Sequence, residues 1–155
     1  MHLLSPFVPG ETVVNALAVQ RRGVIAVAGK LGVQRSVVHP IALLGSHGRL
    51  LKSYAGESLG HPPEGHAIGV QSNGKFVVGG DFSMRMPDGE LRSRIVRFHR
   101  NGTVDTSFWA FEGPNGPVHA LAIQPHGNIV VAGRFNLMND VPVNNIARLF
   151  GDPAR

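Results

Sequence analysis

The sequence VHALAIQPHGNIVVAGRF at residues 118–135 decides the fold of this chain. Alternating apolar residues fill positions 118–123, a turn follows at 124–127, and a second apolar run ends at Gly133. Apolar alternation on both sides of a tight turn with glycine is typical of two antiparallel strands. The stretch therefore predicts a β-hairpin.

The same hairpin pattern occurs twice earlier in the chain. Residues 15–31 (NALAVQRRGVIAVAGKL) match residues 119–135 at 9 of 17 positions without a gap, and residues 66–82 (HAIGVQSNGKFVVGGDF) match at 8 of 17. The repeated glutamines are 51 and then 53 residues apart, a period typical of solenoids and propeller blades. The recurring positions are Gln20, Gln71 and Gln124, then Gly23, Gly74 and Gly127, then Gly29, Gly80 and Gly133.

Each hairpin is followed by further strand signals. A polar segment leads to a third apolar strand, and a fourth short strand ends in serine and an aromatic ring in the first two copies. The third strands are residues 41–44, 95–98 and 146–149, and the fourth strands are residues 49–54 and 103–108. The third copy lacks its fourth strand, but residues 3–7 have the required spacing. No segment shows a sustained helical apolar period.

We therefore expect an all-β, propeller-like fold with three four-stranded antiparallel blades in one domain, residues 1–155. The repeat units are expected at about residues 8–54, 55–108 and 109–155, with residues 1–7 completing the open blade of the last unit.

These residues resemble the delta-sixty repeat, a bacterial repeat family of β-propeller type. The resemblance rests on NGTVDTSF at 101–108, GPVHALAIQPHGNIVVAGRF at 116–135 and NIARL at 145–149, and it is strongest over residues 65–149. It implies a propeller architecture and an exported or cell-surface location. The first copy departs from the pattern, with Leu31 and Tyr54 at positions where the others have phenylalanine.

Three blades are too few to close a ring, because propellers usually need about four to eight. Three arrangements stay open: a homodimer that closes a six-bladed ring, a segment of a longer propeller, and an open arc resting on a partner. In the dimer, residues 3–7 of each copy would complete the open blade of the other. Two-fold closure is the commonest solution for soluble homo-oligomers and favours the dimer.

The composition excludes several classes of function. The chain has no cysteine, so it has no disulfide framework and no thiolate chemistry. No apolar run reaches about 18 residues, so we expect no membrane span, and the first residues lack the features of a signal peptide. The net charge is +5, and we expect a solvated basic surface. The densest basic cluster is Arg92, Arg94, Arg97 and Arg100.

No motif indicates catalysis, a cofactor or a metal. There is no nucleophile-elbow sequence, and no spacing singles out a pair of carboxylates for acid–base chemistry. The run HPPEGH at 61–66 offers two histidines and a glutamate, which are zinc ligand types. It has no fourth ligand near in sequence and no counterpart in the other copies, so we expect an ordinary loop.

The repeated residues are expected to have structural roles. The glutamines should satisfy backbone groups of their own turns. Gly23 and its equivalents should adopt positive φ, and Gly29 and its equivalents should allow close backbone approach. Phe108 is expected in the core, and Trp109 and Phe111 between blades.

We expect a non-catalytic binding or scaffold module whose ligand contacts segments that differ between copies, at residues 30–40, 81–93 and 134–144. The candidate ligand-binding residues are Trp109, Arg134, Asn136, Asp81 and Arg85. Two alternatives are a carbohydrate-binding propeller, with Trp109 stacking on a sugar, and a binder of nucleic acid or another polyanion through the basic surface.

Overall fold

The computed structural model describes residues 6–34, 37–108 and 112–152. All regular structure in these residues is β, as the sequence predicts. The strands are β1 (Val13–Val19), β2 (Ile25–Gln34), β3 (Val37–Leu44), β4 (Leu50–Tyr54), β5 (Glu64–Val70), β6 (Phe76–Arg85), β7 (Leu91–Phe98), β8 (Val118–Ile123), β9 (Ile129–Gly133), β10 (Leu137–Met138), β11 (Val141–Pro142) and β12 (Ile146–Leu149).

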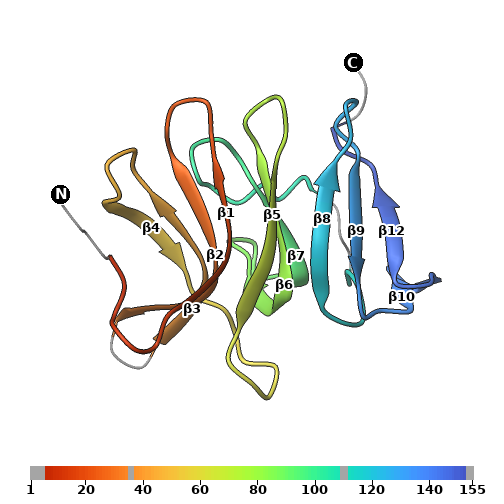
Figure 1. Cartoon of the computed structure of the whole chain (residues 1–155). Helices are drawn as coiled ribbons and strands as arrows, with labels where there is room; N and C mark the ends of the chain where they lie inside the picture. The colour runs from red at the N-terminus through yellow and green to blue at the C-terminus, as the bar shows by residue number, and fades with distance from the viewer. Residues whose placement is uncertain (1–5, 35–36, 109–111, 153–155) are drawn as a thin grey trace.

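The strands form three antiparallel sheets that follow one another along the chain (Figure 1). The first sheet has the order β1-β2-β3-β4, the second β5-β6-β7 and the third β8-β9-β12. The hairpin β10-β11 lies in the connection between β9 and β12. The innermost strands β1, β5 and β8 contact one another in turn, so the sheets are stacked face to face as a fan.

The two ends of the sheets differ. The hairpins β1–β2, β5–β6 and β8–β9 all turn at one end, at the top of Figure 1, which we call the turn end. The opposite end, the loop end, carries the connections that lead from one sheet to the next. The turn glycines Gly23, Gly74 and Gly127 have φ of 80°, 85° and 84°, which confirms their predicted conformation.

The second predicted role of glycine is confirmed as well. A Cβ on Gly29, Gly80 or Gly133 would lie 2.0, 2.3 or 2.1 Å from a carbonyl oxygen of the neighbouring chain segment. Such distances exclude any side chain.

Of the predicted fourth strands, only β4 forms. In the second sheet, residues 103–108 contribute a single bridge between Phe98 and Val104. Asp105 is the cause, because its carboxylate accepts hydrogen bonds from the Ser107 N–H and hydroxyl and bends the backbone into a turn. The first copy has Leu51 at this position and stays extended. The described strands therefore number four, three and three, and the prediction of four in every sheet is wrong for the second.

The predicted loops at 30–40 and 81–93 are largely strands. β2 continues to Gln34 and β3 already begins at Val37, while β6 and β7 leave only a short turn between Arg85 and Leu91. The register shifts in both ladders at the repeated glycines, between Ala28 and Leu31 and between Gly79 and Ser83. Such a bulge bends a strand without ending it, and apolar alternation does not reveal it.

The predicted aromatic positions lie in the packed interior. Phe108 and Tyr54 are buried, and Phe7 is partly buried against the outer face of the first sheet. Phe108 is therefore a core residue, as expected. Residues 3–5 of the predicted completing strand, together with Trp109 and Phe111, lie outside the described residues.

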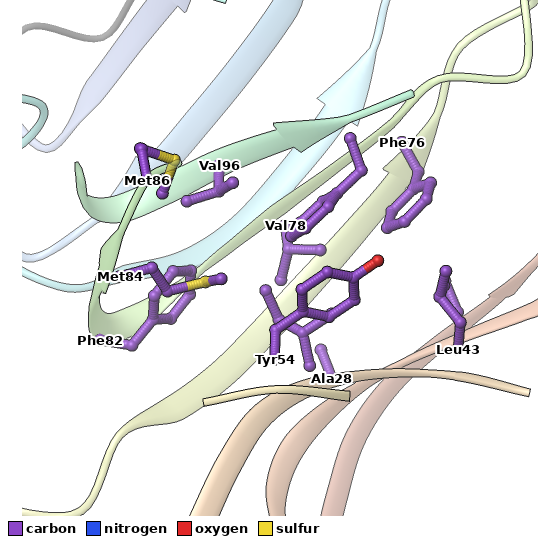
Figure 2. Close-up of a cluster of buried hydrophobic side chains, with 12 residues drawn as sticks. Ala28, Leu43, Tyr54, Phe76, Val78, Phe82, Met84, Met86 and Val96 are labelled. Atoms are coloured by element: carbon purple, nitrogen blue, oxygen red, sulfur yellow. The ribbon is translucent and has the colours of Figure 1, made fainter. Parts of the chain in front are cut away.

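The core lies between the sheets. The second sheet packs one face against the first sheet and the other face against the third. Figure 2 shows the cluster between the first and second sheets, where Tyr54 meets side chains of β6 and β7. The stacked rings of Phe76 and Phe98 have centroids 4.8 Å apart. On the opposite face of the second sheet, Val77 and Ile95 pack against the third sheet. Burial of both faces accounts for the nearly continuous apolar run of β6.

Gly79 sets how closely the third sheet approaches the second. A Cβ on Gly79 would lie 2.5 Å from Val118 Cγ1. We expect Gly79→Ala to lower the free energy of unfolding by about 1–3 kcal/mol, because the buried clash forces the sheets apart. Chemical denaturation measures the change. Gly45→Ala is the matched control, because its Cβ would meet atoms only at 3.6 Å or more. Equal stability of both variants would contradict this role.

Candidate functional site

The turn end is the basic end of the molecule. Five cationic side chains lie in or beside its hairpin turns, and eight of the ten acidic residues lie at the loop end. The cations are Arg21, Arg22, Arg49, Lys75 and Arg100. The acidic residues of the loop end are Glu11, Glu57, Glu64, Asp81, Asp88, Glu90, Glu112 and Asp140. The segregation gives one end a positive potential that the net charge alone does not reveal.

Four of these cations have no acidic partner among the residues that the structure describes. Arg21, Arg22, Arg49 and Arg100 form no ion pair with a carboxylate there. All four are exposed, and Arg21, Arg22 and Arg100 line the hollows at this end. Their full positive charge is therefore available to an anion in solution.

A groove of about 560 Å³ opens at this end between the first and second sheets. Its lining combines cations with amide and hydroxyl groups: Gln20, Arg22, Val24, Asn73, Lys75, His99, Arg100, Asn101 and Thr103. A second hollow of about 350 Å³ shares Gln20, Asn73 and Arg100 and adds Arg21 to the lining. The two hollows make one continuous basic surface, which we call the turn-end groove.

A buried ion network supports the floor of the groove. Arg97 Nε donates to Asp105 Oδ2 at 2.9 Å, and Lys75 Nζ lies 3.0 Å from the same oxygen. Asp152 joins from the end of the third sheet, with its Oδ1 2.8 Å from Lys75 Nζ and 2.9 Å from Arg97 Nη2. The Arg97 guanidinium also lies 4.5 Å from the centroid of Phe108. Two cations and two carboxylates thus neutralise each other, with Arg97 and Asp105 buried and Lys75 and Asp152 partly exposed.

The network shifts the pKa values of its members. Burial opposes the charged form of Asp105, but hydrogen bonds from Ser107 and Lys75 and the positive charges of Arg97 and Lys75 outweigh it and lower the pKa to about 2. Burial acts in the same way on Asp152, whose pKa is lowered by Lys75 and Arg97. Burial lowers the pKa of Lys75, but its bonds to Asp152 and Asp105 outweigh this and raise it. All three groups stay charged near neutral pH.

Asp105→Asn tests the network. We expect the free energy of unfolding near neutral pH to fall by roughly 3 kcal/mol, because the substitution leaves Arg97 with an incompletely matched buried charge. The pKa of Asp105 is lowered from 3.8 to about 2, so its ionised form contributes about 2 kcal/mol above roughly pH 4. That contribution is lost as the pH falls through about 4 to 2.

Denaturation curves at several pH values measure this loss. The wild type should lose stability over that interval more steeply than Asp105→Asn. Glu11→Gln, at an exposed position far from the network, should keep the wild-type profile. Parallel profiles for wild type and Asp105→Asn would refute the role of the buried carboxylate.

Two of the repeated glutamines, Gln20 and Gln71, connect neighbouring sheets, and the prediction that they serve their own turns is wrong for both. Gln20 Nε2 donates to the carbonyl of Gly74 at 2.9 Å, and Gln71 Nε2 donates to the carbonyl of Gly127 at 2.8 Å. Each acceptor is the turn glycine of the next sheet. Sequence periodicity finds these residues but does not distinguish a partner in the same repeat from one in the next.

The sequence-predicted site residues of the second copy lie at the loop end in ion pairs. Asp81 is 3.2 Å from His61 Nε2 and 3.6 Å from Arg94 Nε. Arg85 is 2.9 Å from Glu57. Both side chains are thus engaged within the protein, away from the turn-end groove.

The predicted residues of the third copy lie together elsewhere at the loop end. Arg134 and Asn136 line a pocket of about 490 Å³ together with Asn115, Phe135 and Asn145. The Asn115 amide donates to Asn136 Oδ1 at 2.7 Å. The structure therefore places the four described candidates at two separate loop-end sites, and Trp109 lies outside the described residues.

The HPPEGH run does not converge on one point. His61 faces Asp81, whereas His66 Nδ1 lies 3.0 Å from the carbonyl oxygen of Val118. In the described part of the chain, no group of three histidine, aspartate or glutamate side chains is arranged to hold a metal ion. The same residues contain no helix that could cross a membrane.

Sequence reasoning missed the turn-end groove. Arg22, Lys75 and Arg100 belong to different turns that are far apart in sequence, and no local motif unites them. The available signal was that these residues follow the repeated glutamines or the third strands, so all of them had to lie at one end of the sheets.

Comparison with known proteins agrees with this architecture. Residues 71–108 and 124–152 match the family model described as "Domain of unknown function (DUF5122) beta-propeller". A crystal structure of a protein of unknown function from Bacteroides caccae is similar in fold, with a TM-score of 0.51 and 15% sequence identity. The similarity covers 92% of this chain and 48% of that one, so this chain spans about half of its length. No curated protein matches the chain.

The sheets, the repeats and the family match define the class: the chain is a β-propeller-type repeat protein. The two matched segments are similar to a family named for its fold and described as of unknown function.

Proposed function

We propose that the chain is a non-catalytic binding module that holds an anionic polymer in the turn-end groove. The observation that carries this proposal is the presence of three exposed arginines, without acidic partners in the described part of the chain, around a groove lined by amides and a hydroxyl. Arginine is well suited to phosphate, sulfate and carboxylate groups, because its planar fork donates two hydrogen bonds at once.

An extended polymer fits this surface better than a single small anion. Arg21 and Arg22 lie on the β1–β2 turn and Arg100 on the turn that follows β7, so the charges are distributed along the groove. A single phosphate would need donors that converge on one point. Asn101 lines the groove, and its side-chain Oδ1 already accepts from Thr103, which leaves its side-chain nitrogen as the group that can donate.

The paired charges below contribute rigidity rather than affinity. Lys75 lines the groove, but two carboxylates hold its ammonium group. It therefore positions the floor, while the three free guanidinium groups contact the ligand.

We also infer that the repeat is of the delta-sixty type, a resemblance carried by residues 101–108 and 145–149.

A salt series on a single-stranded oligonucleotide tests the proposal. If three cations each neutralise one phosphate, log K should fall with log salt with a slope of about −2, a loss of roughly 20-fold between about 50 and 200 mM salt. Arg22→Gln and Arg100→Gln should each weaken binding and each flatten the slope by about 0.7. Fluorescence anisotropy of the labelled oligonucleotide measures both quantities.

Arg85→Gln is the matched control, because it removes an exposed arginine at the loop end. It should leave the affinity and the slope unchanged, and an uncharged dextran should not compete. Absence of binding at low salt, or equal losses for all three arginine variants, would rule out the turn-end groove as the site.

A further inference from the structure

Within the described residues, the first and third sheets each keep one face without a neighbouring sheet. We call the outer face of the first sheet, with Leu17, Val19 and Val27, the front face. We call the outer face of the third sheet, with Ala122, Ala132 and Ile146, the back face. Because the chain is a repeat, the two internal interfaces show what each face has as a partner elsewhere in the same molecule.

The front face has apolar side chains that the other copies bury. Leu17 and Val19 are 65% and 59% exposed. Their equivalents in β5 are packed in the cluster between the first and second sheets, and those in β8 in the cluster between the second and third. The outer part of the front face is already covered, since Phe7 packs there against the buried cluster of the first sheet.

The back face also exposes residues whose equivalents in the other sheets are buried. Ile146 is 58% exposed, whereas its equivalents Ile41 and Ile95 are 0% and 1% exposed. Ala122 is exposed as well. Its equivalent in the second sheet is Gly69, where a Cβ would lie 2.5 Å from Leu121. Small residues on this face thus receive large ones from the front face of the next sheet.

The two outer faces also carry hydrogen-bonding groups that are unused here but used at the internal interfaces. Gln20 and Gln71 each donate to the turn glycine of the next sheet. Their third equivalent, Gln124, has no hydrogen-bond partner for its side chain among the described residues. The matching acceptor on the front face is the carbonyl of Gly23, which also accepts no hydrogen bond in the described part of the chain.

A second repeated bond behaves in the same way. Asn15 Nδ2 donates to the carbonyl of Gly65 at 2.9 Å, and its equivalent His66 contacts the carbonyl of Val118 through Nδ1 at 3.0 Å. The third equivalent, His119, makes no such bond to the described residues, although its ring stacks on His66. The back face therefore presents two unused side-chain donors in the register in which the internal interfaces use them.

We propose that two copies of this chain associate head to tail, the front face of each on the back face of the other, and close a ring of six sheets. Leu17 and Val19 then lie on Ala122 and Ala132 of the second copy, and Gln124 donates to its Gly23 carbonyl. Each copy uses both faces, so the contact is heterologous, and two contacts complete the ring. The assembly does not depend on what the turn-end groove binds.

The solved structure of similar fold is consistent with this size. This chain matches only 48% of the Bacteroides caccae protein, whose polypeptide is therefore about as long as two copies of this chain.

The mass in solution is the first test. Light scattering should give twice 16.6 kDa over a wide range of concentrations. A folded monomer, or a concentration-dependent series of larger species, would overturn the closed ring. The second of these outcomes would indicate head-to-tail contacts that continue without closing.

Complementary variants test the direction of the contact. Leu17→Asp spoils only the front face and Ala122→Asp only the back face. Each alone should raise the Kd of the dimer by more than about tenfold, because the interface must then bury an unpaired carboxylate. A mixture of the two should form a heterodimer held by one intact contact, between the back face of the first variant and the front face of the second. This heterodimer should be weaker than the wild-type dimer, because its other contact brings both aspartates together, but tighter than the dimer of either variant alone.

Leu91→Asp is the matched control, at a 41% exposed leucine of the second sheet, and should remain a dimer. Circular dichroism should show that every variant keeps its strands, because the substituted side chains are exposed in the single copy. A mixture that stays monomeric, or an Ala122→Asp variant that dimerises like the wild type, would exclude the head-to-tail contact.

Discussion

The fold depends on the packing of one sheet face against the next, with large residues on one side and small ones on the other. Gly69 and Gly79 leave room on the second sheet that Val118 and Leu121 of the third sheet fill. Since the strands of different sheets form no common ladder, this packing and the glutamine bonds to Gly74 and Gly127 hold the sheets in place. Each sheet thus carries a receiving face and an inserting face.

Much of this could be predicted from the sequence. The ungapped match of the three copies identified the equivalents of Gln71, Gly74 and Gly80 in the other two copies. The geometry of tight turns predicted the positive φ of Gly74 and its equivalents. The fourth strand of the second sheet could not be predicted, because the bend at Asp105 follows from a side chain that caps its own backbone. The ends of the strands were also missed, since a bulge continues a strand through residues that read as loop.

The candidate site was harder to predict than the fold. The variable segments of the repeat looked like ligand loops, but Asp81 and Arg85 are engaged in ion pairs within the protein. The turn-end groove is formed by residues of separate turns, and only the stacking of the sheets brings them together. A groove of this kind is a property of the assembled repeats, so comparison of single copies does not reveal it.

Asp152 has a consequence for the shape of the whole molecule. It follows the last strand of the third sheet, yet its carboxylate binds Lys75 and Arg97 of the second. The third sheet is therefore attached to the second at its inner edge by packing and at its outer edge by the ion pairs of Asp152. Together with the packing, these ion pairs restrain the angle between the two sheets and so contribute to the curvature of the arc.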